Sequence, residues 1–402
     1  MRTRRFARCL FAALLLSAGL HTAWADEPDL AAPLPVDPNV KMIELPNGLT
    51  CWMRAHATPP NRMGIWLHVG SGSMNEEDEE RGLAHFLEHM AFRGSENFPP
   101  GTLVKYFESI GLTFGRHQNA FTGFDQTTYV LTLPNTEEET LRKGLLCMAD
   151  FAHRLSLLGE ELEKERGVVL EEIRARKGAR QRIVEKLLPV LLPGSRAAER
   201  LPIGKQEVVE SVERRQFVDY YRKWYRSDNS TLLIVGDIDA EALAAMVTEG
   251  FADWEAVSDP AENADPGINL YRRTRAATIT DPELTTADAS VVSVKPLEAL
   301  KTVGDFRREL VDDIGMWIVN RRLGEMVQKG TAPFQRARLT KYPLWNVCTY
   351  VEAEATGQPD RSVAMLESVL TELKRAREHG FLAQELGDAR KAILAAAEQD
   401  AK

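Results

Sequence analysis

Hydrophobic residues alternate with polar ones in several short runs of the first 250 residues, and this pattern predicts β-strands. Residues 41–55 hold two such runs around Asn47-Gly48, a dipeptide typical of a tight hairpin turn. Residues 113–123 predict a loop or an edge strand. Three further strands are predicted at residues 63–72, 125–134 and 231–238.

Apolar residues at helical spacing predict the helices between these strands. The helices are expected at residues 81–93, 102–110, 136–156, 160–186, 207–225 and 239–250. Strands and helices mix without a strict βαβ alternation. The predicted fold class is therefore α+β, with a mixed or antiparallel sheet packed with helices.

Residues 256–275 are predicted to be a linker, because their first fifteen residues contain two prolines, a glycine and several acids. The linker separates residues 41–255 from a second domain at residues 276–402. The last helical run reaches Lys402 without a capping residue or a closing strand, so we expect the second domain to be incomplete. Its expected strands cover residues 289–296 and 345–354, and its expected helices cover residues 305–329, 360–379 and 382–401.

The first 25 residues have a pattern of their own. A basic start, a short apolar run and an A-x-A end before Asp26 are typical of a secretory signal peptide. The apolar run is shorter than the roughly 20 residues that a membrane helix needs. We therefore exclude residues 1–25 from the fold and expect residues 26–40 to be an extended lead-in. A retained N-terminal anchor is the alternative.

The net charge argues against binding to nucleic acid or anionic membranes, and the cysteine content argues against a disulfide framework or a zinc–cysteine site. The formal net charge is −9, and it becomes −13 without the N-terminal segment, which carries four arginines and no acids. A chain this negative is not attracted to nucleic acid or to anionic membranes. Cys51, Cys147 and Cys348 are too few and too far apart for a disulfide framework or a zinc–cysteine site, and we expect buried thiols.

Two histidines and a glutamate lie within five residues of the predicted helix 81–93. His85 and His89 are four residues apart, so both project from one helix face, where two imidazoles can bind one metal ion. Glu88 lies beside them and can reach a water molecule without being a ligand. Core histidines with ordinary hydrogen bonds are the alternative. The acidic run at residues 76–80 fits a solvated first turn of this helix.

A catalytic zinc ion usually has three protein ligands and one open position, so a third ligand is needed. Glu165 lies in the predicted helix 160–186, on one stripe with Leu162, Val169 and Glu172. A carboxylate between leucine and valine on a buried stripe needs a cation, which makes Glu165 a candidate. The alternative is a solvated glutamate on a helix that is charged throughout.

These motifs resemble the pitrilysin/insulysin/mitochondrial-processing-peptidase family, whose members carry the inverted zinc motif H-x-x-E-H. Residues 82–99, GLAHFLEHMAFRGSENFP, are similar to the family signature almost throughout. The family's third ligand is a glutamate in an E-R-x-x-V-x-x-E segment, and Glu165 lies in such a segment, 76 residues after His89. Residues 111–135 resemble the segment that carries an Asn-Ala pair near the bound peptide.

The resemblance implies a zinc-dependent endopeptidase that hydrolyses unfolded peptides or small proteins and holds one Zn²⁺ per chain. A non-catalytic family member that serves as a substrate-binding or assembly subunit is the alternative. The residue roles that the resemblance implies are zinc ligands at His85, His89 and Glu165, a general base and acid at Glu88, a residue orienting a histidine ligand at Glu172, and substrate-backbone binding at Asn119 and Ala120.

The resemblance also implies an architecture. Family members form a clam of two homologous halves, each with two related domains. Residues 41–255 would be the zinc-binding peptidase domain and residues 276–402 the second homologous domain of the N-terminal half. We expect the other half in the same longer chain or in a separate subunit. With the signal peptide, the expected location is the periplasm of a Gram-negative bacterium.

Overall fold

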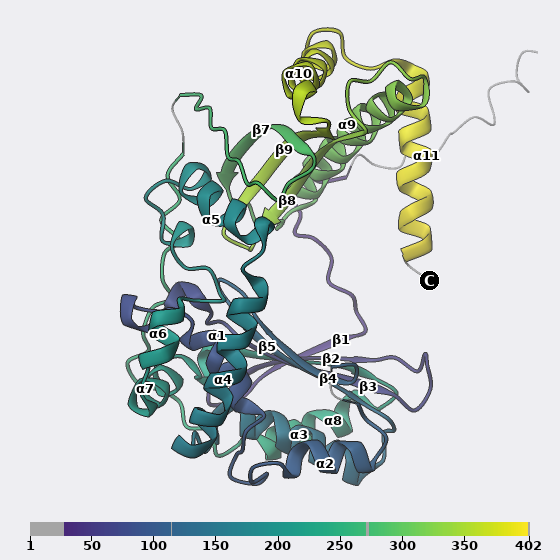
Figure 1. The fold of residues 1–402 in the computed structure, drawn as a ribbon. Coiled ribbons are helices and arrows are strands. Elements are labelled where there is room, and N and C mark those ends of the chain that lie inside the picture. The colour runs from purple at the N-terminus through teal and green to yellow at the C-terminus, as the bar shows by residue number, and fades with distance from the viewer. Residues whose placement is uncertain (1–27, 114, 271–272, 401–402) are drawn as a thin grey trace, which may run out of the picture.

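The computed structural model describes residues 28–113, 115–270 and 273–400. Two sheets, each with helices packed on it, form two parts of the molecule (Figure 1). The expected signal peptide, residues 1–25, lies outside the described residues. Within the described ranges, no helix combines the length and the apolarity needed to cross a membrane.

The first part is built on a six-stranded mixed sheet in the order β1-β2-β6-β3-β5-β4. Strands β2 and β6 run parallel, and the other neighbours run antiparallel. The predicted hairpin and strands are confirmed, and residues 113–123 contain the edge strand β4. The strands are β1 (Val40–Glu44), β2 (Thr50–Ala55), β3 (Met63–Val69), β4 (Gln118–Thr122), β5 (Thr127–Leu133) and β6 (Ser230–Gly236).

Helices pack against this sheet in two places: on one of its faces, and against its strands β4 and β5. Helices α3 and α8 pack on the sheet face, and α1 packs on β4, β5, α4 and α7 (Figure 1). The helices are α1 (Leu83–Ala91), α2 (Thr102–Ser109), α3 (Glu138–His153), α4 (Gly159–Arg176), α5 (Ala179–Leu191), α6 (Gln206–Ser211), α7 (Arg214–Trp224) and α8 (Ala240–Gly250).

Two helices that the sequence predicted as continuous are broken. Residues 160–186 fall in α4 and α5, because Gly178 between them has an extended backbone. Residues 207–225 fall in α6 and α7, because Val212 and Glu213 are extended. The break after α4 ends that helix at the edge of the site described below and lets α5 run on toward the second sheet (Figure 1).

Helix α1 is fixed by a buried carboxylate at its start and by apolar packing along its length. The side chain of Glu76 is fully buried and accepts hydrogen bonds from the backbone N–H groups of Gly82 (3.0 Å) and Ala84 (2.9 Å). Such N–H groups have no partner within the helix, and the oxygens of Glu76 satisfy them even though burial raises the pKa of this carboxyl to about 8. The expectation of a solvated acidic run was therefore wrong for Glu76. Phe86 of α1 packs edge to face on Phe217 of α7.

The second part has a three-stranded antiparallel sheet in the order β7-β9-β8. Helices α9 and α10 pack on this sheet, and α11 packs on α9 (Figure 1). The sequence pattern missed β8, whose exposed edge position leaves charged residues among its apolar ones. The elements are β7 (Ala287–Pro296), α9 (Val303–Gln328), β8 (Arg336–Leu344), β9 (Cys348–Gly357), α10 (Ser362–His379) and α11 (Ala383–Asp400). All three cysteines among the described residues are free and buried, as predicted.

The two parts meet at the turn between β8 and β9. The ring of Trp345 stacks on that of Phe124, with centroids 4.4 Å apart. The side-chain amide of Asn346 donates a hydrogen bond to Asp125 at 2.6 Å. A shared apolar cluster lies around these contacts. Its buried members are Met74, Phe124, Leu188, Leu192, Ala197, Val294, Leu344, Val347, Cys348 and Tyr350.

One arginine joins the three helices of the second part. Arg322 of α9 is buried and donates to Glu372 of α10 at 2.9 Å. The same guanidinium holds both carboxylate oxygens of Glu385 in α11, at 2.6 and 2.7 Å. Buried charges need partners of opposite sign, so this arginine stabilises the contact among the three helices.

Replacing Arg322 with leucine is expected to lower the free energy of unfolding by about 3 kcal/mol, because the buried carboxylate of Glu372 loses its closer partner and keeps only the longer contact with Arg375 at 3.5 Å. Urea denaturation at pH 7 measures this loss. Arg321→Leu is the matched control, since this neighbour is partly exposed and its ion pairs contribute about 1 kcal/mol or less. Equal losses of stability in the two variants would contradict the role of Arg322 in stabilising the contact among α9, α10 and α11.

The loss should also depend on pH. The guanidinium of Arg322 holds the pKa of Glu385 at about 2, below the roughly 4.3 of an unfolded glutamate. A carboxyl group with a lowered pKa stabilises the fold above its unfolded pKa, and this contribution is lost as the pH falls toward the folded value. The difference between wild type and Arg322→Leu should therefore shrink as the pH falls from about 5 toward 2.

Candidate metal centre

Two imidazole rings from α1 form the base of the site. His85 and His89 lie one helical turn apart, and their ring centroids are separated by 4.8 Å. His85 is buried, and the side chain of His89 is 21% exposed. The helical spacing brings the Nε2 atoms of both rings to the same side, as the sequence predicted.

A carboxylate from α4 approaches both rings. Oε2 of Glu172 lies 3.6 Å from Nε2 of His85 and 3.4 Å from Nε2 of His89. These distances are too long for good hydrogen bonds. Ligand atoms 2.0–2.2 Å from a tetrahedral ion lie about 3.4 Å from one another. The two distances from Oε2 of Glu172 therefore match the spacing of ligands around one zinc ion, and all three atoms lie within 4.8 Å of one another.

Arg176 orients the carboxylate of Glu172. It lies one turn further along α4, and its guanidinium donates to Oε1 of Glu172 at 2.5 Å. This contact occupies one carboxylate oxygen and leaves Oε2 directed toward the two histidines. Glu172 is thus prepared to offer a single oxygen.

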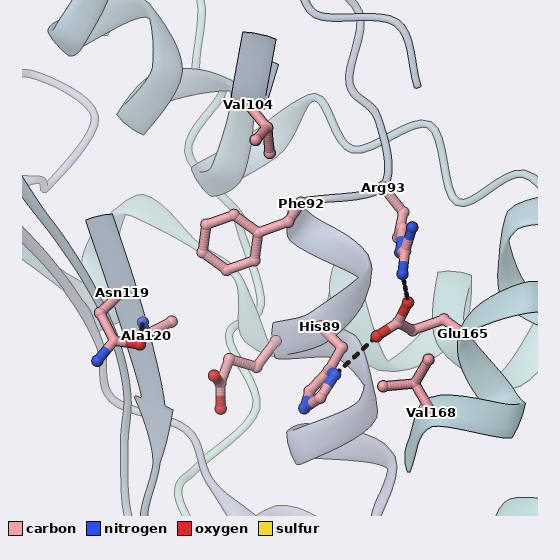
Figure 2. A pocket seen from close by; sticks show the side chains of 9 residues that line it. His89, Phe92, Arg93, Val104, Asn119, Ala120, Glu165 and Val168 are labelled. Carbon is pink, nitrogen blue, oxygen red and sulfur yellow. Dashed lines mark hydrogen bonds and ion pairs between the residues drawn. The ribbon is translucent and has the colours of Figure 1, made fainter. Parts of the chain in front are cut away.

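Glu165 lies on the other side of the His89 ring. Its Oε1 is 2.8 Å from Nδ1 of His89, and its second oxygen pairs with Arg93 (Figure 2). A carboxylate on the ring nitrogen away from the metal fixes the ring orientation and increases the basicity of the other nitrogen. The sequence led us to expect Glu165 as third ligand and Glu172 as the orienting residue, and the geometry favours the reverse.

The electrostatics of the histidines suit a bound cation. Burial lowers the pKa of His85 to about 4, which keeps its ring in the neutral form that binds metal. Burial also acts to lower the pKa of His89, but the hydrogen bond with Glu165 and the charges of the nearby carboxylates outweigh it and raise that pKa. The surroundings of His89 thus favour a positive charge, which a metal ion supplies.

Glu88 lies beside the ligand atoms without joining them. Its carboxylate accepts a hydrogen bond from the hydroxyl of Thr122 at 2.7 Å. Burial raises the pKa of Glu88, against the opposing effects of Thr122 and His89. A glutamate whose pKa is shifted toward neutrality is suited to accept and return protons.

A cavity of about 490 Å³ opens in front of Glu88 and His89. Asn119 and Ala120 of β4 lie across this cavity from His89 (Figure 2). Because β4 is an edge strand, its outer side can receive an extended peptide, which would replace the hydrogen bond that the N–H of Ala120 donates to Oδ1 of Asn119 at 3.0 Å. Apolar side chains complete the wall: Phe92, Val104 and Val168.

All seven residues that the sequence singled out therefore lie in or beside one site: His85, Glu88, His89, Asn119, Ala120, Glu165 and Glu172. Sequence reasoning missed Arg93, Arg176 and Thr122. Arg93 lies four residues after His89, and Arg176 lies four residues after Glu172. This helical spacing was the signal that could have located the two arginines beside the site. Thr122 lies two residues after Ala120, on the same face of the strand, which was the signal for its position beside the site.

Comparisons with known proteins agree with this site. A family model described as insulinase, peptidase family M16, matches residues 53–191. A second, described as peptidase M16 inactive domain, matches residues 211–297. The first model contains all the residues that line the cavity.

The curated relatives include the "Probable zinc protease PqqL" of Escherichia coli strain K12. The chain is 31% identical to it over 397 residues, which are 98% of this chain and 41% of PqqL. The chain thus spans less than half the length of this relative.

Solved structures show the same fold. The first half of the periplasmic protease PqqL from Escherichia coli matches with a TM-score of 0.85 and 29% identity, covering 92% of this chain and 79% of that one. A mutant of the ferredoxin protease FusC, solved with Arabidopsis ferredoxin, matches with a TM-score of 0.76 and 25% identity over 92% of this chain and 41% of that one. These likenesses and the two family models lead to one conclusion: the chain belongs to the insulinase family, peptidase family M16.

Proposed function

We propose that this chain is the zinc-binding part of an endopeptidase that hydrolyses peptide bonds of unfolded peptides or small proteins. The observation that carries the proposal is the convergence of His85, His89 and Glu172 beside the carboxylate of Glu88. Membership of a peptidase family supports the reaction class. The complex of FusC with ferredoxin supports a protein substrate.

The zinc ligands in this proposal are the two Nε2 atoms and Oε2 of Glu172. When bound, the zinc ion supplies a Lewis acid that lowers the pKa of water and polarises the scissile carbonyl. Glu165 holds the ring of His89 in the orientation that the ligand set needs, and Arg176 does the same for Glu172.

Glu88 performs the proton transfers. Its carboxylate accepts a proton from the attacking water and returns it to the amine of the departing peptide half. The hydroxyl of Thr122 holds one carboxylate oxygen and leaves the other free to take the proton.

The substrate adds to the open edge of β4. Its backbone pairs with Asn119 and Ala120, and a side chain enters the cavity lined by Phe92, Val104 and Val168. This placement brings the scissile bond between β4 and α1. His89 lies across the cavity from the strand (Figure 2), and Glu88 accepts the hydrogen bond of Thr122.

The proposal includes a partner and a location. The chain spans 41% of PqqL, which supports a second homologous half, in the same longer chain or in a separate subunit. Residues 1–402 alone are then weak or inactive. Two observations support a periplasmic location: the similar PqqL of Escherichia coli is a periplasmic protease, and the first 25 residues have the pattern of a secretory signal.

A non-catalytic family member is the second function that we consider. Such a subunit needs no complete set of ligands and base, and the presence of His85, Glu88, His89 and Glu172 at one site supports the enzyme instead. Purified protein that contains no zinc and still binds peptide would support the non-catalytic subunit.

Glu88→Gln is expected to reduce peptide hydrolysis by about 10³-fold, because the amide cannot accept the proton from water. Zinc content should stay at one per chain, since Glu88 is not a ligand. Rates on a quenched fluorescent peptide, with elemental analysis of the same samples, measure both quantities in the complete assembly. Equal rates in wild type and variant would refute the role of Glu88.

Replacing Glu172 with glutamine is expected to weaken zinc binding more than replacing Glu165. Loss of an orienting residue weakens metal binding by about 10- to 100-fold, which is the expectation for Glu165→Gln. Glu172→Gln removes a ligand and should exceed that range. Competition with a chromogenic chelator measures both affinities. Glu171→Gln is the control, because this exposed neighbour pairs with Arg174. A larger loss for Glu165→Gln would favour Glu165 as the third ligand, as the sequence predicted.

A further inference from the structure

The turn between β4 and β5 links the proposed base to the second part of the molecule. Thr122, whose hydroxyl donates to Glu88, is the last residue of β4. Residues 123–126 follow as the turn, closed by a hydrogen bond from the N–H of Gly123 to the carbonyl of Gln126 at 2.8 Å. The position of this turn therefore decides where the Thr122 hydroxyl lies.

The segment that leads into α1 holds the turn from one side. The N–H groups of Ser73 and Met74 donate to the carbonyls of Gly123 and Phe124, at 3.1 and 2.7 Å. The approach is so close that a Cβ atom on Gly72 would lie 2.4 Å from the carbonyl oxygen of Gly123. The turn and the start of the metal-binding helix are thus fixed to each other.

The β8–β9 turn of the second part holds it from the other side. Trp345 stacks on Phe124, and Asn346 donates to Asp125 at 2.6 Å. Both residues have left-handed backbones, with φ of 50° and 56°. Asparagine tolerates this conformation, but a bulky residue such as tryptophan rarely adopts it. Strained backbone persists where the surroundings fix it, and such positions cluster at functional sites.

We propose that Trp345 and Asn346 are positioning residues of the peptidase: they fix the turn at residues 123–126 and so hold the Thr122 hydroxyl on Glu88. The inference rests on the proposed function of Glu88 as proton acceptor. Through Trp345 and Asn346, the second part of the molecule would affect the rate of catalysis without contacting the substrate.

The hydroxyl of Thr122 is tested first, in the complete zinc-loaded assembly. Thr122→Val keeps the side-chain shape and removes the donor, so kcat should fall by about tenfold while KM stays within about twofold. Thr122→Ser retains the donor and should restore kcat. A Thr122→Ser variant as slow as Thr122→Val would overturn the role of the hydroxyl.

Trp345 is tested by its coupling to Thr122. Trp345→Ala should lower kcat by a similar factor on its own and cause no further loss in the Thr122→Val background, because both changes break one contact. Asn346→Ala should act in the same direction. Phe306→Ala is the control, since it truncates a partly exposed aromatic residue of α9 in the same part of the molecule. Independent, multiplicative losses for Trp345 and Thr122 would overturn the proposal.

Hydrogen exchange in metal-free protein separates this inference from the proposed function. Trp345→Ala should speed exchange of the amides at residues 118–126 by about tenfold and leave α3 unchanged, whereas Phe306→Ala should alter neither. Unchanged exchange at residues 118–126 would overturn the inference even in an active peptidase. Faster exchange, together with a complete wild-type assembly that hydrolyses no peptide, would refute the proposed function and leave the restraint on the turn established.

Discussion

The carboxylates around His89 make a positive charge favourable beside this ring, and the geometry of the site follows from that constraint. Three carboxylates, those of Glu88, Glu165 and Glu172, lie around this ring, and they raise its pKa although burial acts to lower it. The Nε2 atoms of both histidines face an oxygen of Glu172 at distances that suit ligands rather than hydrogen-bonded partners. A divalent cation satisfies the two Nε2 atoms and Oε2 of Glu172 at once, and without one the same arrangement would leave these three atoms in poor contact.

The rest of the fold serves to hold these few atoms in place. Glu76 caps the start of α1, apolar packing fixes the helix along its length, and the extended backbone at Gly178 ends α4 just beyond Glu172 and Arg176. Edge strand β4 places Thr122 on Glu88 and turns toward the cavity an edge that pairs with no other strand among the described residues. Rigid elements on three sides thus give the base and the ligand set a defined geometry before any substrate binds.

The sequence predicted the site better than the details of its geometry. The H-x-x-E-H spacing located the metal-binding helix, since helical periodicity alone brings two histidines to one face. Glu165 and Glu172 share one stripe of α4, so periodicity cannot distinguish them, and only the shift of about 10 Å along the helix decides which oxygen reaches the Nε2 atoms. Strand β8, the burial of Glu76 and the Trp345 turn depend on contacts between distant segments, which local patterns do not record.

We infer that one zinc ion is bound by His85, His89 and Glu172 together. A crystal structure of the zinc-loaded protein, with anomalous diffraction collected on both sides of the zinc absorption edge, tests it directly. We expect a single zinc peak bonded to Nε2 of both histidines and to Oε2 of Glu172, with Glu165 on Nδ1 of His89. A peak bonded to Glu165 in place of Glu172, or none between the two helices, would contradict it.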